Sequence, residues 1–315
     1  MTERLNPLND FLFMKYMGEK GDETQLLSFL NAVLKKTERD KLTAVEILEN
    51  KTLTPEIIGD KTSILDIRAV TNDGSKINIE VQVCKFKDMA RRSLFYWSRE
   101  YVRGIKAGQM YTELPKVIAI NIVDFEFIPE VDFHSVFHIR EDTHKECFLT
   151  DALEIHFVDM VKWRSIIKKD IEGDLLQRWL AFFDKTTPEK TLKEIINMDK
   201  AIQEAQKRIT YVSADDEALR AYQMREMGLS DWNSRLFDAR QEGLNEGKQE
   251  GILEGKREGI REGEQKGLKE GLEQGLEKGR QETIKTSARK MKALGISLEQ
   301  IREITGLSPA EIEKL

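Results

Sequence analysis

The stretch ILDIRAVTNDGSKINIEVQV, residues 64–83, decides the fold. In each half of it apolar residues alternate with polar ones, which is the period-2 pattern of a strand with one buried face. Asn72-Asp73-Gly74 between the halves consists of residues that favour turns. The stretch therefore predicts two antiparallel strands joined by a tight turn.

The length of the turn determines which side chains share a face. A two-residue turn would place Asp66 opposite Val81, on the apolar face. A three-residue loop, with Gly74 in the left-handed conformation, instead sets apolar residues opposite one another. The resulting pairs are Leu65–Val81, Ile67–Ile79 and Ala69–Ile77. Because a slip of one residue turns every side chain to the other face, the apolar pairing selects the three-residue loop and places Asp66 opposite Glu80.

Asp66 and Glu80 would then face each other, where like charges repel and one pKa rises. A hard cation removes this conflict, since Mg²⁺ in proteins takes one or two carboxylates together with waters and substrate phosphates. Gln82 follows on the same face, roughly 6.6–6.8 Å along the strand, and its amide can orient a water or contact a phosphate. The alternative is a solvated strand face on which Arg68 or Lys76 neutralises the acids.

The order Asp66, turn, Glu80-x-Gln82 resembles the motif of the PD-(D/E)XK nucleases, with Gln82 at the position of the usual lysine. The chain is also similar, over about residues 5–300, to the recombination-promoting nuclease and transposase family of that superfamily. The stretches that carry this similarity are 9–15, 92–111 and 114–127.

The resemblance implies an α/β fold with a restriction-endonuclease-like core, a mixed sheet flanked by helices, followed by an α-helical C-terminal extension. It also implies metal-dependent hydrolysis of DNA, with Asp66 and Glu80 as ligands of Mg²⁺ or Mn²⁺. Gln82 would be the third catalytic residue, and glutamine is a usual occupant of that position in the family. In such nucleases an acidic residue of the first helix sometimes completes the metal site. Asp10 is the candidate, unless it only caps that helix.

Glutamine lacks the positive charge that lysine brings to the scissile phosphate. Catalysis is therefore weaker, or another cation such as Lys61, Lys85 or Arg68 substitutes. Lys61, which precedes the Asp66 strand, is also a candidate for binding DNA phosphate. The alternative for Lys61 is a solvated strand end.

Residues 87–111 predict a long helix in which arginines alternate with aromatic residues. Arginines on one helix face can hold a DNA backbone, and the candidates are Arg91, Arg92, Arg99 and Arg103. The alternative is an amphipathic helix that packs its aromatic residues on the sheet and leaves the arginines in solvent.

Further elements follow from apolar spacing. Residues 6–36 and about 161–235 have the helical period, and apolar strands are predicted at 116–123, 133–140 and 153–158. Together they predict one nuclease-like domain over residues 1–235, whose C-terminal part is helical. His134 and His138 share strand parity, but zinc sites on strands lack this spacing, so we expect satisfied or surface histidines.

Residues 236–283 change character, because glycine occurs at every fourth position from Gly243 to Gly279. Each glycine lowers helix propensity by about 0.8–1 kcal/mol relative to alanine, so an isolated helix here would be marginal. The hypothesis is close helix–helix approach along the glycines, in a homodimer or against the same chain. The alternative is a flexible, solvated spacer.

Residues 284–315 predict two short helices around Gly306. Ser297 and Ser308 are natural N-caps, and Pro309 suits a first helical position. The unit resembles the helix-turn-helix of DNA resolvases, but its second helix carries Glu311 and few basic residues, whereas DNA contacts need Arg, Lys, Asn or Gln. A packing or dimerisation module is therefore favoured over a DNA-binding one.

Composition limits the functional classes. The 315 residues carry a net charge of −6, so any DNA binding depends on local basic patches. Cys84 and Cys147 form neither a disulfide framework nor a zinc site. No run approaches the ~20 apolar residues of a membrane span, and the N-terminus lacks a signal-peptide core. We expect a cytoplasmic protein that binds no membrane.

Two functions remain open. The first is a metal-dependent DNA endonuclease of low sequence specificity that promotes recombination or DNA mobility. The second is a catalytically weakened module that uses the nuclease fold to bind DNA or other proteins. Activity of the intact Asp66 and Glu80 pair distinguishes the two.

Overall fold

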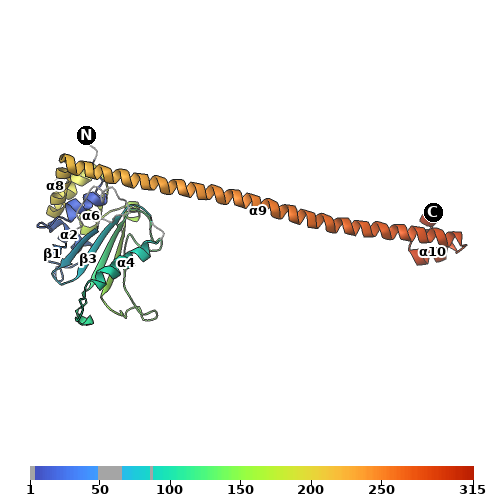
Figure 1. The fold of residues 1–315 in the computed structure, drawn as a ribbon, viewed down its shortest axis with the longest axis horizontal. Helices are drawn as coiled ribbons and strands as arrows, with labels where there is room; N and C mark the ends of the chain where they lie inside the picture. Colours follow the sequence, from blue (N-terminus) through green and yellow to red (C-terminus); the bar gives the residue numbers. More distant parts are fainter. Residues whose placement is uncertain (1–3, 49–65, 86–87) are drawn as a thin grey trace. The chain divides into compact units, whose positions relative to one another are not determined.

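The computed structural model describes residues 4–48, 66–85 and 88–315 (Figure 1). The chain divides into two compact units, Met1–Leu236 and Phe237–Leu315. The first unit holds the sheet and most of the helices. The second consists of the greater part of a long helix and two short ones.

The described strands form one mixed sheet in the order β1-β2-β3-β4-β6-β5. They are β1 (Val45–Ile47), β2 (Asp66–Thr71), β3 (Lys76–Gln82), β4 (Val117–Val123), β5 (His134–Phe137) and β6 (Leu153–Asp159). Strands β1 to β3 are antiparallel, β3, β4 and β6 are parallel, and β5 returns antiparallel to β6. The expected α/β architecture with a mixed sheet is confirmed. The short strand β1 was not expected from the sequence.

The β2–β3 hairpin has the predicted register. Ile67 pairs with Ile79, and Asp66 pairs with Glu80. Gly74 in the connecting loop has φ +83°, a conformation that glycine adopts without strain. The three-residue loop is therefore confirmed for the described part of the hairpin, while Leu65 lies outside the described residues.

Helices cover both faces of the sheet. The large core lies on the face of Ile67 and Ile79, under four helices. These are α1 (Asp10–Met17), α2 (Thr24–Val33), α6 (Leu175–Phe183) and α8 (Lys200–Ala214). The opposite face carries a smaller core, in which Met89 and Trp97 of α4 (Met89–Val102) pack on β4 and β6. The remaining short helices of this unit are η1 (Tyr111–Glu113), α5 (Met160–Ser165) and α7 (Glu189–Met198).

Two helix boundaries differ from expectation. Asn9, not Asp10, caps α1, because its side chain accepts a hydrogen bond from the Leu12 amide at 3.1 Å. Helix α4 ends at Val102, whereas the pattern predicted a helix to residue 111. Gly104 lies just beyond this end of the helix, and a Cβ atom added to it would lie 2.6 Å from Pro115 Cδ. The chain therefore turns at Gly104 in close contact with the segment that precedes β4.

The glycine repeat lies within one continuous helix, α9 (Asp216–Ala293). A Cβ atom added at any repeat glycine from Gly243 to Gly279 would meet no described atom within 4 Å. Within this unit no described atom packs against the glycines, and close helix–helix approach along them stays a prediction. Apolar side chains beside the glycines are exposed, for example Leu244, Ile260 and Leu268. A homodimer through these residues stays a prediction.

The C-terminal residues form a small helical module. Helices α10 (Leu298–Thr305) and α11 (Pro309–Glu313) pack on the end of α9 through Ala288, Ile301 and Ile312. Both predicted serine caps precede their helices, and Gly306 between them has φ +71°. Two short helices thus flank Gly306, and the assignment of this unit as a helix-turn-helix-like module stays a prediction.

Candidate functional site

The predicted acidic pair lies on neighbouring strands. Asp66 of β2 is directly opposite Glu80 of β3, so both side chains leave the sheet on the same face. Gln82 shares that face, because side chains two residues apart on a strand point the same way. Asn121 of β4 is the parallel partner of Glu80. Strand pairing thus brings the three predicted catalytic residues to the face that α4 covers.

Glu80 is a buried carboxylate, with 2% of its surface exposed. Its Oε1 accepts hydrogen bonds from Gln82 Nε2 at 2.8 Å and from the Arg92 guanidinium at 3.3 Å. Burial raises the pKa of Glu80, the bonds from Gln82 and Arg92 oppose this rise, and the charge of Asp66 adds a smaller increase. The expected repulsion between the two acids is present, but loss of water is the larger cause.

Arg92 supplies a positive charge at the acidic pair. It lies in the first turn of α4, and its guanidinium carbon is 5.5 Å from the Tyr96 ring centroid. We expected Arg92 as a DNA contact, yet its side chain is only 22% exposed and pairs with Glu80. Sequence alone does not reveal this contact, because the approach of α4 to β3 depends on packing.

Three cations were expected as possible replacements for the missing lysine, namely Arg68, Lys85 and Lys61. Arg68 pairs with Glu100 of α4 at 2.7 Å, and the other oxygen of Glu100 receives Arg103 at the same distance. Arg68 therefore neutralises a helix carboxylate. Lys85 is exposed, and Lys61 lies outside the described residues.

Tyr96 is a site residue that the sequence pattern did not single out. Burial raises the pKa of its hydroxyl, the charge of Arg92 opposes that rise, and the charges of Glu80 and Asp66 contribute to it. The phenol therefore lies within the electrostatic reach of both carboxylates. A phenolic hydroxyl can donate a hydrogen bond to a water or a phosphate oxygen. The available signal was its position four residues after Arg92, on the same side of a helix.

A buried hydrogen bond holds α4 on the sheet beside Glu80. Asn121 Nδ2 donates to Ser93 Oγ at 2.8 Å and to the backbone oxygen of His156 at 3.1 Å. Ser93 follows Arg92 directly, so this contact fixes the turn of α4 from which Arg92 reaches Glu80. Neither residue was a candidate from the sequence.

Asp10 lies in an ion pair with α9. Its Oδ1 accepts a bond from Arg225 Nε at 2.8 Å, and its Oδ2 accepts one from the terminal guanidinium nitrogen at 2.5 Å. The Arg225 side chain is 4% exposed. The structure thus assigns Asp10 a structural contact, and its role as a metal ligand remains a prediction.

The outer side of α4 combines positive charge with aromatic surface. Arg91 and Arg99 are exposed, and the Arg99 guanidinium lies 5.8 Å from the ring centroid of Phe95, which is 57% exposed. Arg103 is about half exposed beyond its contact with Glu100. These side chains are accessible to a nucleic acid, and their role in binding DNA stays a prediction.

The donor atoms of the site suit a divalent cation. Asp66 and Glu80 offer carboxylate oxygens and Gln82 an amide oxygen, which are the hard ligands that Mg²⁺ prefers. Within the described residues no group of three or more His, Cys, Asp or Glu side chains is placed to hold a metal. Two carboxylates completed by waters and phosphate oxygens are a usual coordination for Mg²⁺.

A mixed sheet flanked by helices, with opposed carboxylates on its hairpin, defines a nuclease-like α/β protein of the PD-(D/E)XK type. The family model of the PD-(D/E)XK nuclease family transposases matches residues 7–239, and the chain belongs to this family. No curated protein and no solved structure matches the chain. Across the described ranges, no helix has both the length and the apolar character needed to span a bilayer.

Membership supports a nuclease-type function with DNA as substrate. Nucleases of this superfamily typically use divalent metals. Both statements agree with the oxygen donors and the adjacent guanidinium of the site described above.

Proposed function

We propose that the protein is a Mg²⁺- or Mn²⁺-dependent DNA endonuclease of low sequence specificity. The observation that carries this proposal is the direct pairing of Asp66 with Glu80 on one face of the sheet. Two acids in that arrangement are unfavourable unless a cation lies between or beside them. Membership in a nuclease family makes a catalytic divalent ion the natural candidate.

Asp66 and Glu80 would hold the ion, with Asp10 as a further candidate ligand. A divalent ion bound there supplies Lewis acidity, polarising the scissile phosphodiester and lowering the pKa of the attacking water. Glu80 must be ionised to act as a ligand. Burial raises the pKa of Glu80, and the hydrogen bond from Gln82 together with the charge of Arg92 favours the ionised form in the free protein.

Gln82 and Arg92 divide the tasks that one lysine performs in the usual motif. The Gln82 amide orients the Glu80 carboxylate through its 2.8 Å hydrogen bond, and its oxygen remains available to a water. Arg92 brings the positive charge that stabilises the developing charge on the phosphate. Tyr96 offers a hydroxyl for a phosphate oxygen beside them.

DNA would lie along α4, held through its phosphates by Arg91, Arg99 and Arg103. Contacts to phosphates carry no sequence information by themselves, which accounts for the low specificity proposed. Cutting or nicking of this kind would promote recombination or mobility of DNA in the cytoplasm. A homodimer through the glycine repeat would place two such sites on one substrate.

Plasmid cleavage tests this proposal. With Mg²⁺ or Mn²⁺, the wild-type protein should convert supercoiled plasmid to nicked and linear forms. Asp66→Asn and Glu80→Gln should lower the rate by at least about 100-fold, the scale of losing a principal electrostatic contribution to catalysis. EDTA should abolish cleavage by the wild type.

Glu46→Gln is the matched control, because Glu46 is an exposed carboxylate on the same sheet. Its cleavage rate should equal that of the wild type. Equal rates for wild type, Asp66→Asn and Glu80→Gln would refute the assignment. Complete absence of cleavage with retained DNA binding would favour the weakened binding module instead.

A further inference from the structure

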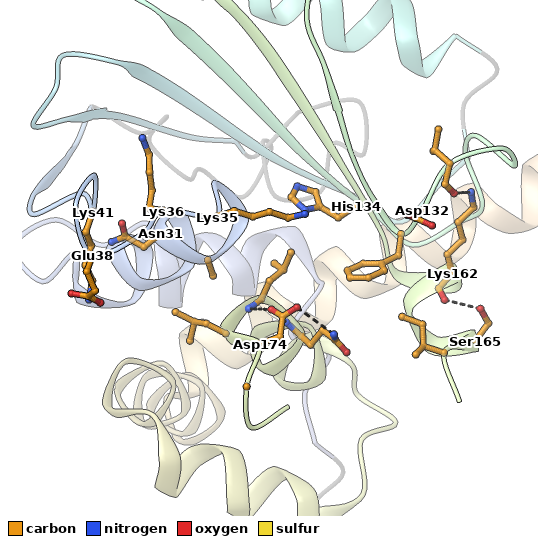
Figure 2. A pocket seen from close by; sticks show the side chains of 18 of the residues that line it. Asn31, Lys35, Lys36, Glu38, Lys41, Asp132, His134, Lys162, Ser165 and Asp174 are labelled. Carbon is orange, nitrogen blue, oxygen red and sulfur yellow. Dashed lines mark hydrogen bonds and ion pairs between the residues drawn. The ribbon is translucent and has the colours of Figure 1, made fainter. Parts of the chain in front are cut away.

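A cavity lies away from the acidic pair, against the opposite face of the sheet. It has a volume of about 1000 Å³, at the upper end of the size of small-molecule sites. The segment after α2 forms one wall, the start of β5 contributes His134, and α5 and the first turn of α6 complete it (Figure 2). The nuclease proposal uses none of these residues.

Lys35 has an unusual backbone at the rim of this cavity. The turn after α2 is a Schellman motif, because the amides of Lys35 and Lys36 donate to the carbonyl oxygens of Ala32 and Asn31. Glycine normally occupies the left-handed position of this motif. Lys35 adopts the left-handed conformation with φ +50°, and it is the only non-glycine residue in the described ranges with a positive φ. A side chain with a Cβ atom is strained in this conformation.

The ammonium group of Lys35 makes no hydrogen bond or ion pair with any described residue. The other lysines of the wall differ in this respect. Lys36 lies 3.8 Å from Asp40, and Lys162 donates to backbone oxygens that include Pro129 at 3.2 Å. An uncommitted positive charge on a strained residue beside a cavity is the arrangement of a ligand contact.

His134 contributes an unsatisfied acceptor to the same cavity. Lys116 and His156 Nε2 both contact the Glu154 carboxylate, at 2.5 and 2.6 Å. The other ring nitrogen of His156, Nδ1, lies 3.0 Å from His134 Nε2. Burial alone would raise the pKa of Glu154, but the hydrogen bonds from His156 and Lys116 lower this pKa to about 2. The Glu154 carboxylate is therefore ionised and accepts the hydrogen bond from His156.

The contacts between Glu154, His156 and His134 are consistent with one direction of donation. His156 donates to Glu154, His134 donates to His156, and His134 Nδ1 is left with a lone pair. That atom is buried and has no hydrogen-bond partner among the described residues. Burial, with smaller effects of His156 and Lys35, lowers the pKa of His134 to about 4. The His134 ring therefore stays neutral at physiological pH, and its Nδ1 lacks a hydrogen-bond donor.

We propose that this cavity binds a phosphate ester of nucleotide size. Its phosphate would pair with the Lys35 ammonium, and a hydroxyl or amino group would donate to His134 Nδ1. Lysine is a common phosphate ligand because its charge is compact and unshared. Asp174 does not compete for the ammonium groups, since its carboxylate caps α6 and accepts from Gln177.

Isothermal titration of the full-length protein in EDTA tests the site without any cleavage. The probes are inorganic phosphate, a deoxynucleoside 5′-monophosphate and a short single-stranded oligonucleotide. Lys35→Gly removes the ammonium and also relieves the positive φ, so thermal unfolding should stay at or above the wild-type temperature. Its affinity for the mononucleotide should nevertheless fall about tenfold or more.

Lys35→Gln, which keeps the strained backbone, should lose the same affinity, and Lys145→Gln on an exposed loop should lose none. Asp66→Asn should bind as tightly as wild type, which separates this site from the nuclease proposal. A loss seen with the oligonucleotide alone would overturn the proposal, because it would show that Lys35 contacts nucleic acid and not a ligand of nucleotide size. Equal affinities of Lys35→Gly and wild type, or no binding of any probe at millimolar concentration, would overturn the proposal.

Discussion

Glu80 holds its carboxylate in a buried position between the Gln82 amide and the Arg92 guanidinium. A buried carboxylate is costly to ionise, and an opposite charge nearby lowers that cost. In the proposed metal site, the balance at this one residue would set the pH at which a cation binds. Arg92, twelve positions further along the chain, would then matter alongside the motif residues.

Replacement of Arg92 by methionine should raise the pKa of Glu80 further, because one of the two groups that oppose the effect of burial is lost and only the Gln82 hydrogen bond remains. If ionised Glu80 is needed for cleavage, the acid limb of the pH–rate profile moves to higher pH. We expect roughly tenfold lower activity near pH 6 and a smaller loss above pH 8. Plasmid-nicking rates measured across pH 5–9 check this.

Arg91→Met is the control, since Arg91 is the exposed neighbour of Arg92 on the same helix. It should weaken DNA binding, chiefly at low salt, and leave the position of the acid limb unchanged. A limb that moves equally in both variants would mean that general charge, and not the contact with Glu80, controls the pH dependence.

At the scale of elements, the contact of α1 with α9 decides how Asp10 is interpreted. The buried Arg225 side chain pairs with the Asp10 carboxylate. Asp10→Ala should therefore destabilise the first unit by about 3–5 kcal/mol, because it removes the carboxylate that pairs with a buried guanidinium. Chemical denaturation followed by circular dichroism measures this.

The double variant Asp10→Leu with Arg225→Leu should recover most of that stability, since an apolar pair of similar volume can replace a buried ion pair. Its cleavage activity then isolates the remaining question. Wild-type activity in the stable double variant would exclude Asp10 as a metal ligand, whereas an inactive but stable one would support that role.

The glycine repeat of α9 is the second element whose role can be separated experimentally. Alanine at Gly247, Gly255, Gly263 and Gly271 meets no described atom and should stabilise the helix by about 0.8–1 kcal/mol per site. If a homodimer uses close approach along the glycines, the added methyl groups should weaken it. Sedimentation equilibrium and thermal circular dichroism measure the two effects on the same protein.

A more stable helix together with weaker dimerisation would support the glycine contact. Unchanged dimerisation would mean that the exposed apolar side chains, or no part of the repeat, hold two copies together. A wild-type protein that is monomeric at every concentration would remove the homodimer from the proposal.

At the scale of the whole molecule, all the residues of the candidate site belong to the first of the two compact units. The acidic pair, Arg92 and the Asp10–Arg225 ion pair all belong to Met1–Leu236. A chain that ends at Leu236 should therefore keep the thermal transition of the first unit and at least about half of the Mg²⁺-dependent cleavage of a short duplex. Loss of folding on this truncation would show that the second unit supports the core, contrary to the division seen here.

The hairpin was predictable because its information is local. Alternation of Ile67 and Ala69 with polar residues, and the glycine of the loop, are enough to set the register that pairs Asp66 with Glu80. The residue that caps α1 could not be chosen from the sequence alone. Asn9 and Asp10 are both good N-caps, and the choice of Asn9 leaves Asp10 to meet Arg225, a residue more than two hundred positions away.

The α/β class, the paired acids and the two short C-terminal helices were predictable from the amino-acid order, because each depends on a short-range period or spacing. The burial of Glu80, its contact with Arg92 and the cavity that Lys35 and His134 line were not predictable in this way. The physical reason is that burial and electrostatic contact arise between elements distant in the chain, and their packing leaves no periodic trace in the sequence.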